Sequence, residues 1–350
     1  MSPSLDRRLP LIDVGGSPHA VGARLGHFGR EALNAHFRTS AAWRELVRRR
    51  SDPRIEAMAA IVRDRFPRYW AELQGLAEGL DMPFADVFLW NCRGDVWAMA
   101  PDGCTTVQMP GPPHVVGHNE DGDPDFAGHC SLAKVAVEGG TAFTAFIYPG
   151  SLPGHTFACT AAGLVQTVNN VRPLAGGAGV PRMVLARAVL DTGGLDEAIT
   201  LLRTSPRAGA FHLTLARAGD DRLLSVEFTA MSVSVEPIVA PRIHSNHLVH
   251  EATRRISQIV TGSSGERQRR GEELLQRNGA ALPLRAAEIL WDAEDPELPV
   301  HRTDPADGDR ENTLASAVFR IGADCVEWFV YDRPHEAARF EMKQPARASA

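Results

Sequence analysis

Hydrophobic residues in the first hundred positions recur at steps of three and four, which is the spacing of one face of a helix. The longest such pattern covers residues 55–80, and Pro67 inside it predicts a kink or a division into two helices. Asp81 as an N-cap predicts another helix over residues 83–92. With an earlier helix expected over residues 18–37, the N-terminal part is predicted to be helical.

From about Pro101 onward the pattern changes to short strands separated by turn residues. Each predicted hairpin has two strand-like runs around a turn rich in Gly, Pro or Asp, such as Gly139-Gly140. The four hairpins pair residues 104–109 with 114–118, 131–138 with 141–148, 211–218 with 223–229, and 317–321 with 325–331. Helices are expected between them, over about residues 181–190, 195–203, 266–276 and 283–291. Antiparallel strand pairs interrupted by helices are typical of a layered α+β sandwich.

The composition excludes several classes of protein. The chain has 350 residues, of which 44% are hydrophobic and 23% charged, so it can bury a sizeable core. Lys and Arg number 37 against 43 Asp and Glu, and the net charge of −6 argues against a nucleic-acid partner. No apolar run approaches the roughly 18 residues of a membrane span, and no signal peptide is predicted. Five widely spaced cysteines predict a reducing, cytoplasmic location.

The sharpest candidate for chemistry is Cys104, which follows Gly103 and opens the first predicted strand. A cysteine at this position is either a small buried residue or a nucleophile placed at the edge of a sheet. If the first hairpin pairs as predicted, Asn119 and Asp121 return to the neighbourhood of Cys104. A second polar segment, HSNH at residues 244–247, ends another strand.

Six short motifs give the chain a resemblance to a known family. They are DGCTT at residues 102–106, GHNED at 117–121, VPRMVLARAVL at 180–190, VEF at 226–228, HSNH at 244–247 and R-x-x-T-L at 310–314. With these motifs the chain resembles the acyl-coenzyme A:6-aminopenicillanic acid acyltransferase family, the peptidase C45-type members of the N-terminal-nucleophile hydrolases. The motifs occur in the family's order, span most of the chain, and are fairly specific when DGCTT and SNH occur together.

The resemblance implies a four-layer αββα sandwich with antiparallel sheets, and a chain that cuts itself between Gly103 and Cys104. Residues 1–103 would form a helical α subunit and residues 104–350 a catalytic β subunit, and the two fragments would stay associated as one globular unit. The catalytic residues that the motifs imply are Cys104 as the nucleophile, Asp121 as an assisting group, Asn246 as an oxyanion-hole amide and Arg310 as a functionally implicated arginine.

The chemistry of an N-terminal cysteine explains why so few residues are needed. A free thiol has a pKa near 8.5 and therefore requires a base at pH 7. If Cys104 becomes an N-terminus, its own α-amine, with a pKa near 8, is that base, and neither a catalytic histidine nor a cofactor is required. In the self-cleavage step the thiol attacks the carbonyl of Gly103, whose missing Cβ lets the sulfur approach. An amide donor such as Asn246 would stabilise the oxyanion.

Five polar residues around the nucleophile are expected to bind substrate, namely Thr105, Asn119, Glu120, Asn169 and Asn170. Two positions depart from the family's pattern. Glu120 stands where an aromatic residue is common, and His118 precedes Asn119 at a position where polar residues vary. Because this segment borders the site, the departures leave the identity of the substrate open.

The leading hypothesis is hydrolysis of the amide of a small N-acyl compound through a Cys104 thioester. The first alternative is transfer of an acyl group to an amine such as a β-lactam nucleus, with an acyl-amide or an acyl-coenzyme A as donor, although no basic phosphate-binding motif supports coenzyme A. A metal-dependent hydrolase could instead use His244, His247 and His250, and a non-catalytic binding protein could keep Cys104 as core filler. No metal is expected, because His114 and His118 on one strand would lie about 13 Å apart.

Overall fold

The computed structural model describes residues 8–35, 37–101, 103–277, 282–305 and 307–346. Within this part of the chain the strands form two sheets. The order in the eight-stranded sheet is β1 (Leu11–Gly16), β4 (Ser131–Val137), β5 (Phe143–Ile147), β6 (Phe157–Thr160), β7 (Leu164–Asn170), β8 (Phe211–Arg217), β9 (Leu223–Phe228) and β10 (Val233–Pro237). The order in the six-stranded sheet is β11 (Arg242–His244), β2 (Gly103–Met109), β3 (His114–Gly122), β12 (Asn312–Ile321), β13 (Cys325–Tyr331) and β14 (Phe340–Pro345).

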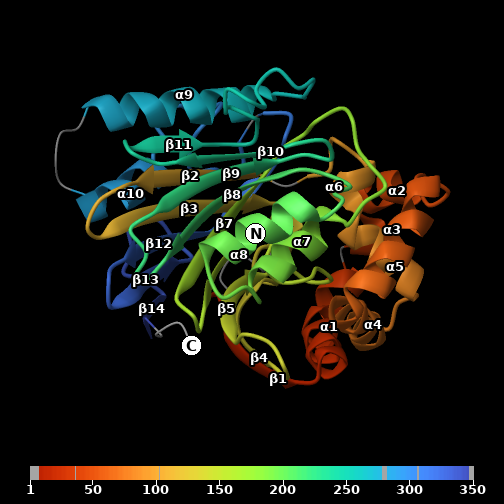
Figure 1. Ribbon diagram of the computed structural model, residues 1–350. Helices are drawn as coiled ribbons and strands as arrows, with labels where there is room; N and C mark the ends of the chain where they lie inside the picture. Colours follow the sequence, from red (N-terminus) through yellow and green to blue (C-terminus); the bar gives the residue numbers. More distant parts are fainter. Residues whose placement is uncertain (1–7, 36, 102, 278–281, 306, 347–350) are drawn as a thin grey trace.

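The helices fall into three groups (Figure 1). The N-terminal group lies to one side of the sheets and consists of α1 (Pro18–Ala35), α2 (Ala41–Val47), α3 (Pro53–Arg65), α4 (Pro67–Leu80), α5 (Phe84–Asn91) and α6 (Arg93–Val96), with the 3₁₀ turn η2 (Phe37–Thr39) between α1 and α2. The second group is α7 (Arg182–Val189) with α8 (Leu195–Thr204), and the third is α9 (Gly262–Arg277) with α10 (Leu282–Leu290). A further 3₁₀ turn, η3 (Pro124–Phe126), follows β3.

The two faces of β2 show how the sheets are packed. Val107 and Met109 join a hydrophobic cluster with Leu290 of α10, so this face of the six-stranded sheet lies against a helix. The alternate residues point the other way, and Thr106 and Gln108 donate hydrogen bonds to residues of β7 and β8. The two sheets therefore face each other at β2 and β7, and α8 contacts β8 and β10 of the eight-stranded sheet.

The α+β class is confirmed, with two sheets in which neighbouring strands run antiparallel except for the pair β1–β4. All four predicted hairpins pair as expected. Pro67 separates α3 from α4, as predicted, because its ring is tolerated in the first turn of a helix and not in its interior. The predicted helix over residues 18–37 is observed up to Ala35, and residue 36 lies outside the described residues.

Two N-terminal predictions are wrong. The first hundred residues are not all helical, because β1 pairs in parallel with β4, more than a hundred residues later in the chain. A six-residue strand whose partner is so distant leaves no local hairpin signal. Asp81 is not an N-cap: it ends α4 in the left-handed conformation with φ of 57°, and Pro83 precedes the first residue of α5. An Asp side chain tolerates this conformation better than most non-glycine residues do.

Candidate active site

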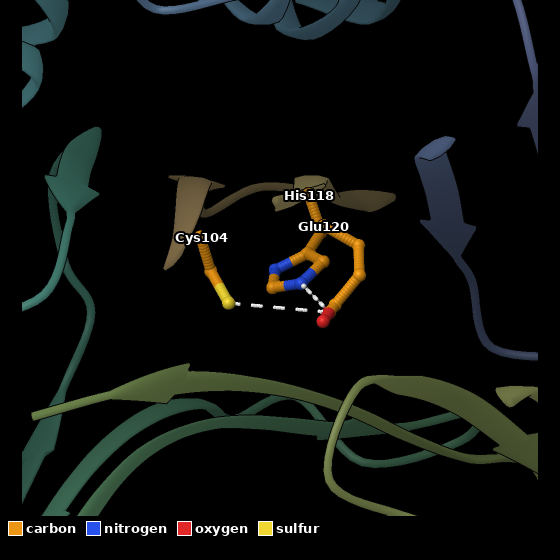
Figure 2. Close-up of side chains that lie close together, drawn as sticks. All are labelled: Cys104, His118 and Glu120. Carbon is orange, nitrogen blue, oxygen red and sulfur yellow. Dashed lines mark hydrogen bonds and ion pairs between the residues drawn. The ribbon is translucent and has the colours of Figure 1, made fainter. Parts of the chain in front are cut away.

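The pairing of β2 with β3 places Cys104 directly opposite Glu120, with both side chains in the space between the sheets. Cys104 is 2% exposed and its Sγ lies 3.9 Å from Oε2 of Glu120 (Figure 2). Side chains two residues apart on a strand share a face, so His118 joins the same group. Its Nε2 lies 3.2 Å from Oε2 of Glu120. A thiol, a carboxyl group and an imidazole thus meet in a buried cluster.

Burial lowers the pKa of His118 to about 3, so the ring is neutral at pH 7 and carries one proton. The other ring nitrogen, Nδ1, lies 2.8 Å from Oγ1 of Thr106, whose hydroxyl also contacts Oδ1 of Asn169 at 2.7 Å. Thr106 donates its single hydroxyl hydrogen to Asn169, so the ring proton of His118 lies on Nδ1 and is donated to Thr106. The other nitrogen, Nε2, faces Glu120 without a proton. A proton that leaves the thiol of Cys104 for Glu120 can therefore be shared between Oε2 and Nε2 of His118.

Asn246 and Arg267 hold the backbone of Cys104. The Cys104 N–H donates to Oδ1 of Asn246 at 3.1 Å, and Nη2 of Arg267 donates to the same oxygen at 2.6 Å. Nη1 of Arg267 donates to the carbonyl oxygen of Cys104 at 2.6 Å. The amide nitrogen of Asn246 donates one hydrogen to the carbonyl of Asn170, which leaves its second hydrogen for another acceptor. The predicted polar group at residues 244–247 does reach Cys104.

Asp121 lies opposite Gly103 in the register of β2 and β3. Its Oδ1 accepts a hydrogen bond from Thr313 at 2.6 Å, and its Oδ2 lies 3.9 Å from Nη1 of Arg267. Because neighbouring strand residues point to opposite faces, Asp121 lies on the α9 side of the sheet, whereas the sulfur of Cys104 lies between the sheets. The carboxylate of Asp121 is therefore near the backbone at the Gly103–Cys104 bond rather than near the thiol.

The remaining predicted residues are divided between the cluster and other places. Asn169 reaches the cluster through Thr106, and Asn170 receives a hydrogen bond from Nη1 of Arg182. Thr105 and Asn119 point to the opposite face from the sulfur. Thr105 contacts Arg267, and the amide of Asn119 donates to the carbonyl of Leu290. Arg310 is exposed on the loop before β12, with φ of 51°. Asp102 of the DGCTT motif lies outside the described residues.

Glu311 is a site residue that the sequence motifs did not single out. A Cβ added to Gly103 would overlap with Oε2 of Glu311, so this carboxyl group lies against the residue that precedes the nucleophile. Burial raises the pKa of Glu311 to about 8, although Nη2 of Arg172 lies 3.4 Å from Oε1 and favours the ionised form. The R-x-x-T-L motif contains this position as an unspecified residue, which is the signal that could have identified it. Arg267 was also missed, because it lies in a strongly charged helix without a motif.

Among the described residues, one group of His, Cys, Asp or Glu side chains could hold a metal ion. Its ligand atoms belong to Cys104, His118 and Glu120 and lie within 4.8 Å of one another. The histidines of the metal-dependent alternative, His244, His247 and His250, are not part of it. His244 is stacked on His212 with ring centroids 3.4 Å apart and lies 3.0 Å from Oε1 of Glu227.

None of the helices in the described ranges is long and apolar enough to cross a membrane. A model of the family described as acyl-coenzyme A:6-aminopenicillanic acid acyl-transferase matches residues 108–335. The chain belongs to this family. The match covers most of the two sheets and the helices between them, including Glu120, Asp121 and Asn246.

A curated relative in Drosophila melanogaster is described as beta-alanyl-dopamine/carcinine hydrolase. It is 27% identical to this chain over 164 residues, which cover 41% of this chain and 42% of the relative. The chain is thus a member of a family that includes acyltransferases and a hydrolase, and the aligned part spans about two fifths of the relative's length.

Proposed function

We propose that the protein is a self-processing cysteine amidohydrolase that cleaves the amide of a small N-acyl compound through a thioester on Cys104. This proposal rests on the environment of Cys104. Cys104 follows a glycine, its amide nitrogen is held by Asn246, and its sulfur faces Glu120 and His118. The family membership supports the general reaction, amide hydrolysis or acyl transfer.

In the maturation step the sulfur of Cys104 attacks the carbonyl carbon of Gly103, and the thiol proton passes to the carboxylate of Glu120. The tetrahedral oxyanion collapses as the C–N bond breaks, and the proton held by Glu120 passes to the departing nitrogen of Cys104, which becomes an amine. Water then hydrolyses the thioester, which releases the carboxyl group of Gly103 and restores the thiol. Arg267, on the carbonyl of Cys104, and Asn246, on its nitrogen, keep this backbone fixed during the exchange.

In the mature enzyme the new α-amine of Cys104 serves as the base. It removes the thiol proton while the sulfur attacks the acyl carbon of the substrate, and it returns a proton to the leaving amine. Asn246 supplies an amide hydrogen to the oxyanion. The carboxylate of Asp121, which lies beside the new N-terminus, orients the α-amine of Cys104. Glu120, Asn169 and Asn170 are proposed to contact substrate, and Arg310, exposed on the rim, to assist at the site. Thr105 and Asn119 were expected to bind substrate too, but they face away from the sulfur and are proposed to hold the strands that carry Cys104 and Glu120.

Residues 1–103 and 104–350 are proposed to remain one globular unit after the cut, arranged as an αββα sandwich. In this arrangement α9 and α10 cover the six-stranded sheet, and α7 and α8 cover the eight-stranded sheet. Contacts of α9 and α10 with β2, and of α8 with β8, support the order of the layers. The pairing of β1 with β4 supports the association, because it makes the N-terminal fragment an edge strand of the larger sheet.

Intact mass spectrometry of the purified protein tests the proposal. We expect two fragments, one ending at Gly103 and one beginning at Cys104, and a single uncut chain for Cys104→Ala. The Cys159→Ala variant is the matched control, because it removes another buried thiol and should leave the cut intact. A Cys104→Ala chain that still splits at this bond would exclude cleavage by this thiol.

Substrates are to be sought among N-acyl amines, N-acyl amino acids and β-lactams, with release of free amine as the readout. The relative described as a hydrolase of beta-alanyl-dopamine and carcinine makes β-alanyl amines the first compounds to assay. The family's description makes acyl transfer to an amine the alternative reaction. Adding a second amine and measuring the ratio of new amide to free acid separates the two.

A further inference from the structure

Glu311 combines burial with an oxygen that has no hydrogen-bond partner. Its side chain is 2% exposed, and Oε2 forms no hydrogen bond within the described residues. This oxygen points at the position that a side chain on Gly103 would occupy. An unpaired buried carboxyl oxygen is unfavourable unless it receives a partner in another state of the protein.

In the proposed self-cleavage mechanism, the position of Gly103 is also the position where the acyl group of a substrate binds. In the maturation step Gly103 is itself the acyl group that is transferred to the sulfur of Cys104. When the Gly103 end is released, an acyl group from a substrate must bind to the same sulfur along the same path. Its α-carbon then takes the place of the α-carbon of Gly103, and its substituent faces Oε2 of Glu311.

We propose, building on the self-processing mechanism above, that Glu311 is an acyl-side subsite that binds the cationic amino group of a short aminoacyl amide. A methyl branch toward Glu311 would clash with the carboxyl group, whereas an ammonium group there takes the place of the acid's proton and gains a charge-assisted hydrogen bond after a small movement of the flexible Glu311 side chain. Glycyl and β-alanyl amides have this chemistry, since neither is branched at the α-carbon.

The charges around Glu311 leave Oε2 for such a ligand. Arg172 lies near the other oxygen, Oε1, at 3.4 Å. Arg302 is paired with Asp307 at 2.7 Å, and Arg267 donates to the backbone of Cys104 and to Asn246. Asp309 adds a further negative charge nearby. Oε2 of Glu311 is thus surrounded by two acidic groups and three arginines. Each arginine already has a hydrogen-bond acceptor, whereas Oε2 has no hydrogen-bond partner among the described residues.

A cleft leads from solvent toward this position. It lies between α2 and the loop before β12, and its lining includes Trp97, Pro101, Arg310 and Glu311. Pro101 lies on the segment that precedes the proposed cut, so the cleft follows the acyl side of the scissile bond. A small aminoacyl compound could therefore reach Glu311 without passing between the sheets.

The experiment compares pairs of arylamides that differ only in charge at the end of the acyl group: glycyl against propionyl, and β-alanyl against butyryl. For the wild-type enzyme we expect kcat/KM to be about 10- to 100-fold higher for the cationic member of each pair, the range of one hydrogen bond to a charged group. In Glu311→Gln this ratio should fall toward 1. Glu297→Gln, an exposed carboxyl group on a loop, is the matched control and should keep the wild-type ratio.

The outcomes separate this inference from the proposed function. A wild-type protein that cuts itself and hydrolyses both members of a pair equally would overturn the Glu311 subsite and leave the amidohydrolase in place. An equal loss on both members in Glu311→Gln, or a Glu311→Gln chain that stays uncut, would show that Glu311 serves Cys104 itself and would also overturn it. A wild-type chain that stays uncut and hydrolyses neither amide contradicts the proposed function.

Discussion

The polar run in GHNED is divided between two faces of β3, and this division decides what each side chain can do. Glu120 and His118 point toward the eight-stranded sheet and meet the thiol of Cys104, as Figure 2 shows. Asn119 and Asp121 point toward α9 and α10 and hold the backbone and the neighbouring strands. Before the proposed cut the nitrogen of Cys104 is an amide and not a base, so we expect the thiol to depend on Glu120 at that stage.

Glu120→Gln is therefore expected to slow self-cleavage by about 100-fold or more, which is the lower range for loss of a positioned general base. The measurement is a time course of intact mass after rapid purification. Whatever mature enzyme forms should retain its α-amine as base. Glu138→Gln, an exposed carboxyl group after β4, is the control and should mature at the wild-type rate. Unchanged maturation in Glu120→Gln would remove Glu120 from the mechanism.

The cluster around Cys104 could be predicted from the sequence only in part. The turn between the first two strands fixes the register, so the return of residues 119–121 to Cys104 follows from local pattern and is confirmed. The alternation of side chains along a strand is sufficient to divide these residues between the two faces of the sheet. Arg267 could not be predicted, because it reaches Cys104 from a charged helix about 160 residues later without a motif.

At the scale of elements, the closest packing in the N-terminal part is between α1 and α4. Glycines four residues apart on each helix, Gly22 with Gly26 and Gly75 with Gly79, face the backbone of the other helix. A Cβ on Gly75 would overlap with the backbone of His19, which no rotamer change can relieve. The two helices are therefore in contact through their main chains.

Gly75→Ala should reduce the free energy of unfolding by about 1–3 kcal/mol, the usual effect of overpacking, even though alanine favours a helix. Denaturant unfolding of the variant and the wild type checks this. Gly265→Ala in α9 is the matched control, since a Cβ there is 3.9 Å from Val260 and should stabilise the protein by up to about 1 kcal/mol. Equal stability of Gly75→Ala and the wild type would mean that α1 and α4 can move apart freely.

Elements with local signals were predicted, and those with distant partners were not. The predicted hairpins and the helices between them carry turn residues and hydrophobic periodicity in one continuous stretch. β1 has six residues, and its one partner strand among the described residues, β4, lies far along the chain. Asp81 shows the limit of local signals, because the same residue type serves at either end of a helix and only the fold decides which.

At the scale of the whole molecule, the segment before the proposed cut is held against the rest of the protein by non-covalent contacts as well as by the peptide bond. β1 extends the larger sheet, and in the interior Oε2 of Glu72 on α4 lies 3.2 Å from Nε of Arg187 on α7. Asp95 accepts a hydrogen bond from the backbone nitrogen of Arg182 at 3.1 Å. These contacts stay in place if the peptide bond before Cys104 is hydrolysed.

Glu311 also gives the stability of the uncut chain a pH dependence. Its pKa is raised from the 4.5 of a free side chain to about 8, so between these values the folded form keeps a proton that the unfolded form loses. The free energy of unfolding should therefore fall as pH rises toward 8, by at most about 1.4 kcal/mol per pH unit. Comparing Cys104→Ala with Cys104→Ala/Glu311→Gln by denaturant unfolding at pH 6.5 and 7.5 should show a smaller fall in the second. Equal slopes would mean that Glu311 is ionised in the folded chain.

The groups that surround the bond before Cys104 come from distant parts of the sequence: Asp121 from the next strand, Asn246 and Arg267 from near residue 250, and Thr313 and Glu311 from β12 and the residue before it. During synthesis on a ribosome, the first of these emerges long before the last. A nascent chain that has been extended only as far as α8 contains the thiol and its neighbours in β3, but none of the later groups that hold the backbone in place. The cut would then be delayed until translation has passed β12, and every newly made α fragment would already have its partner beside it.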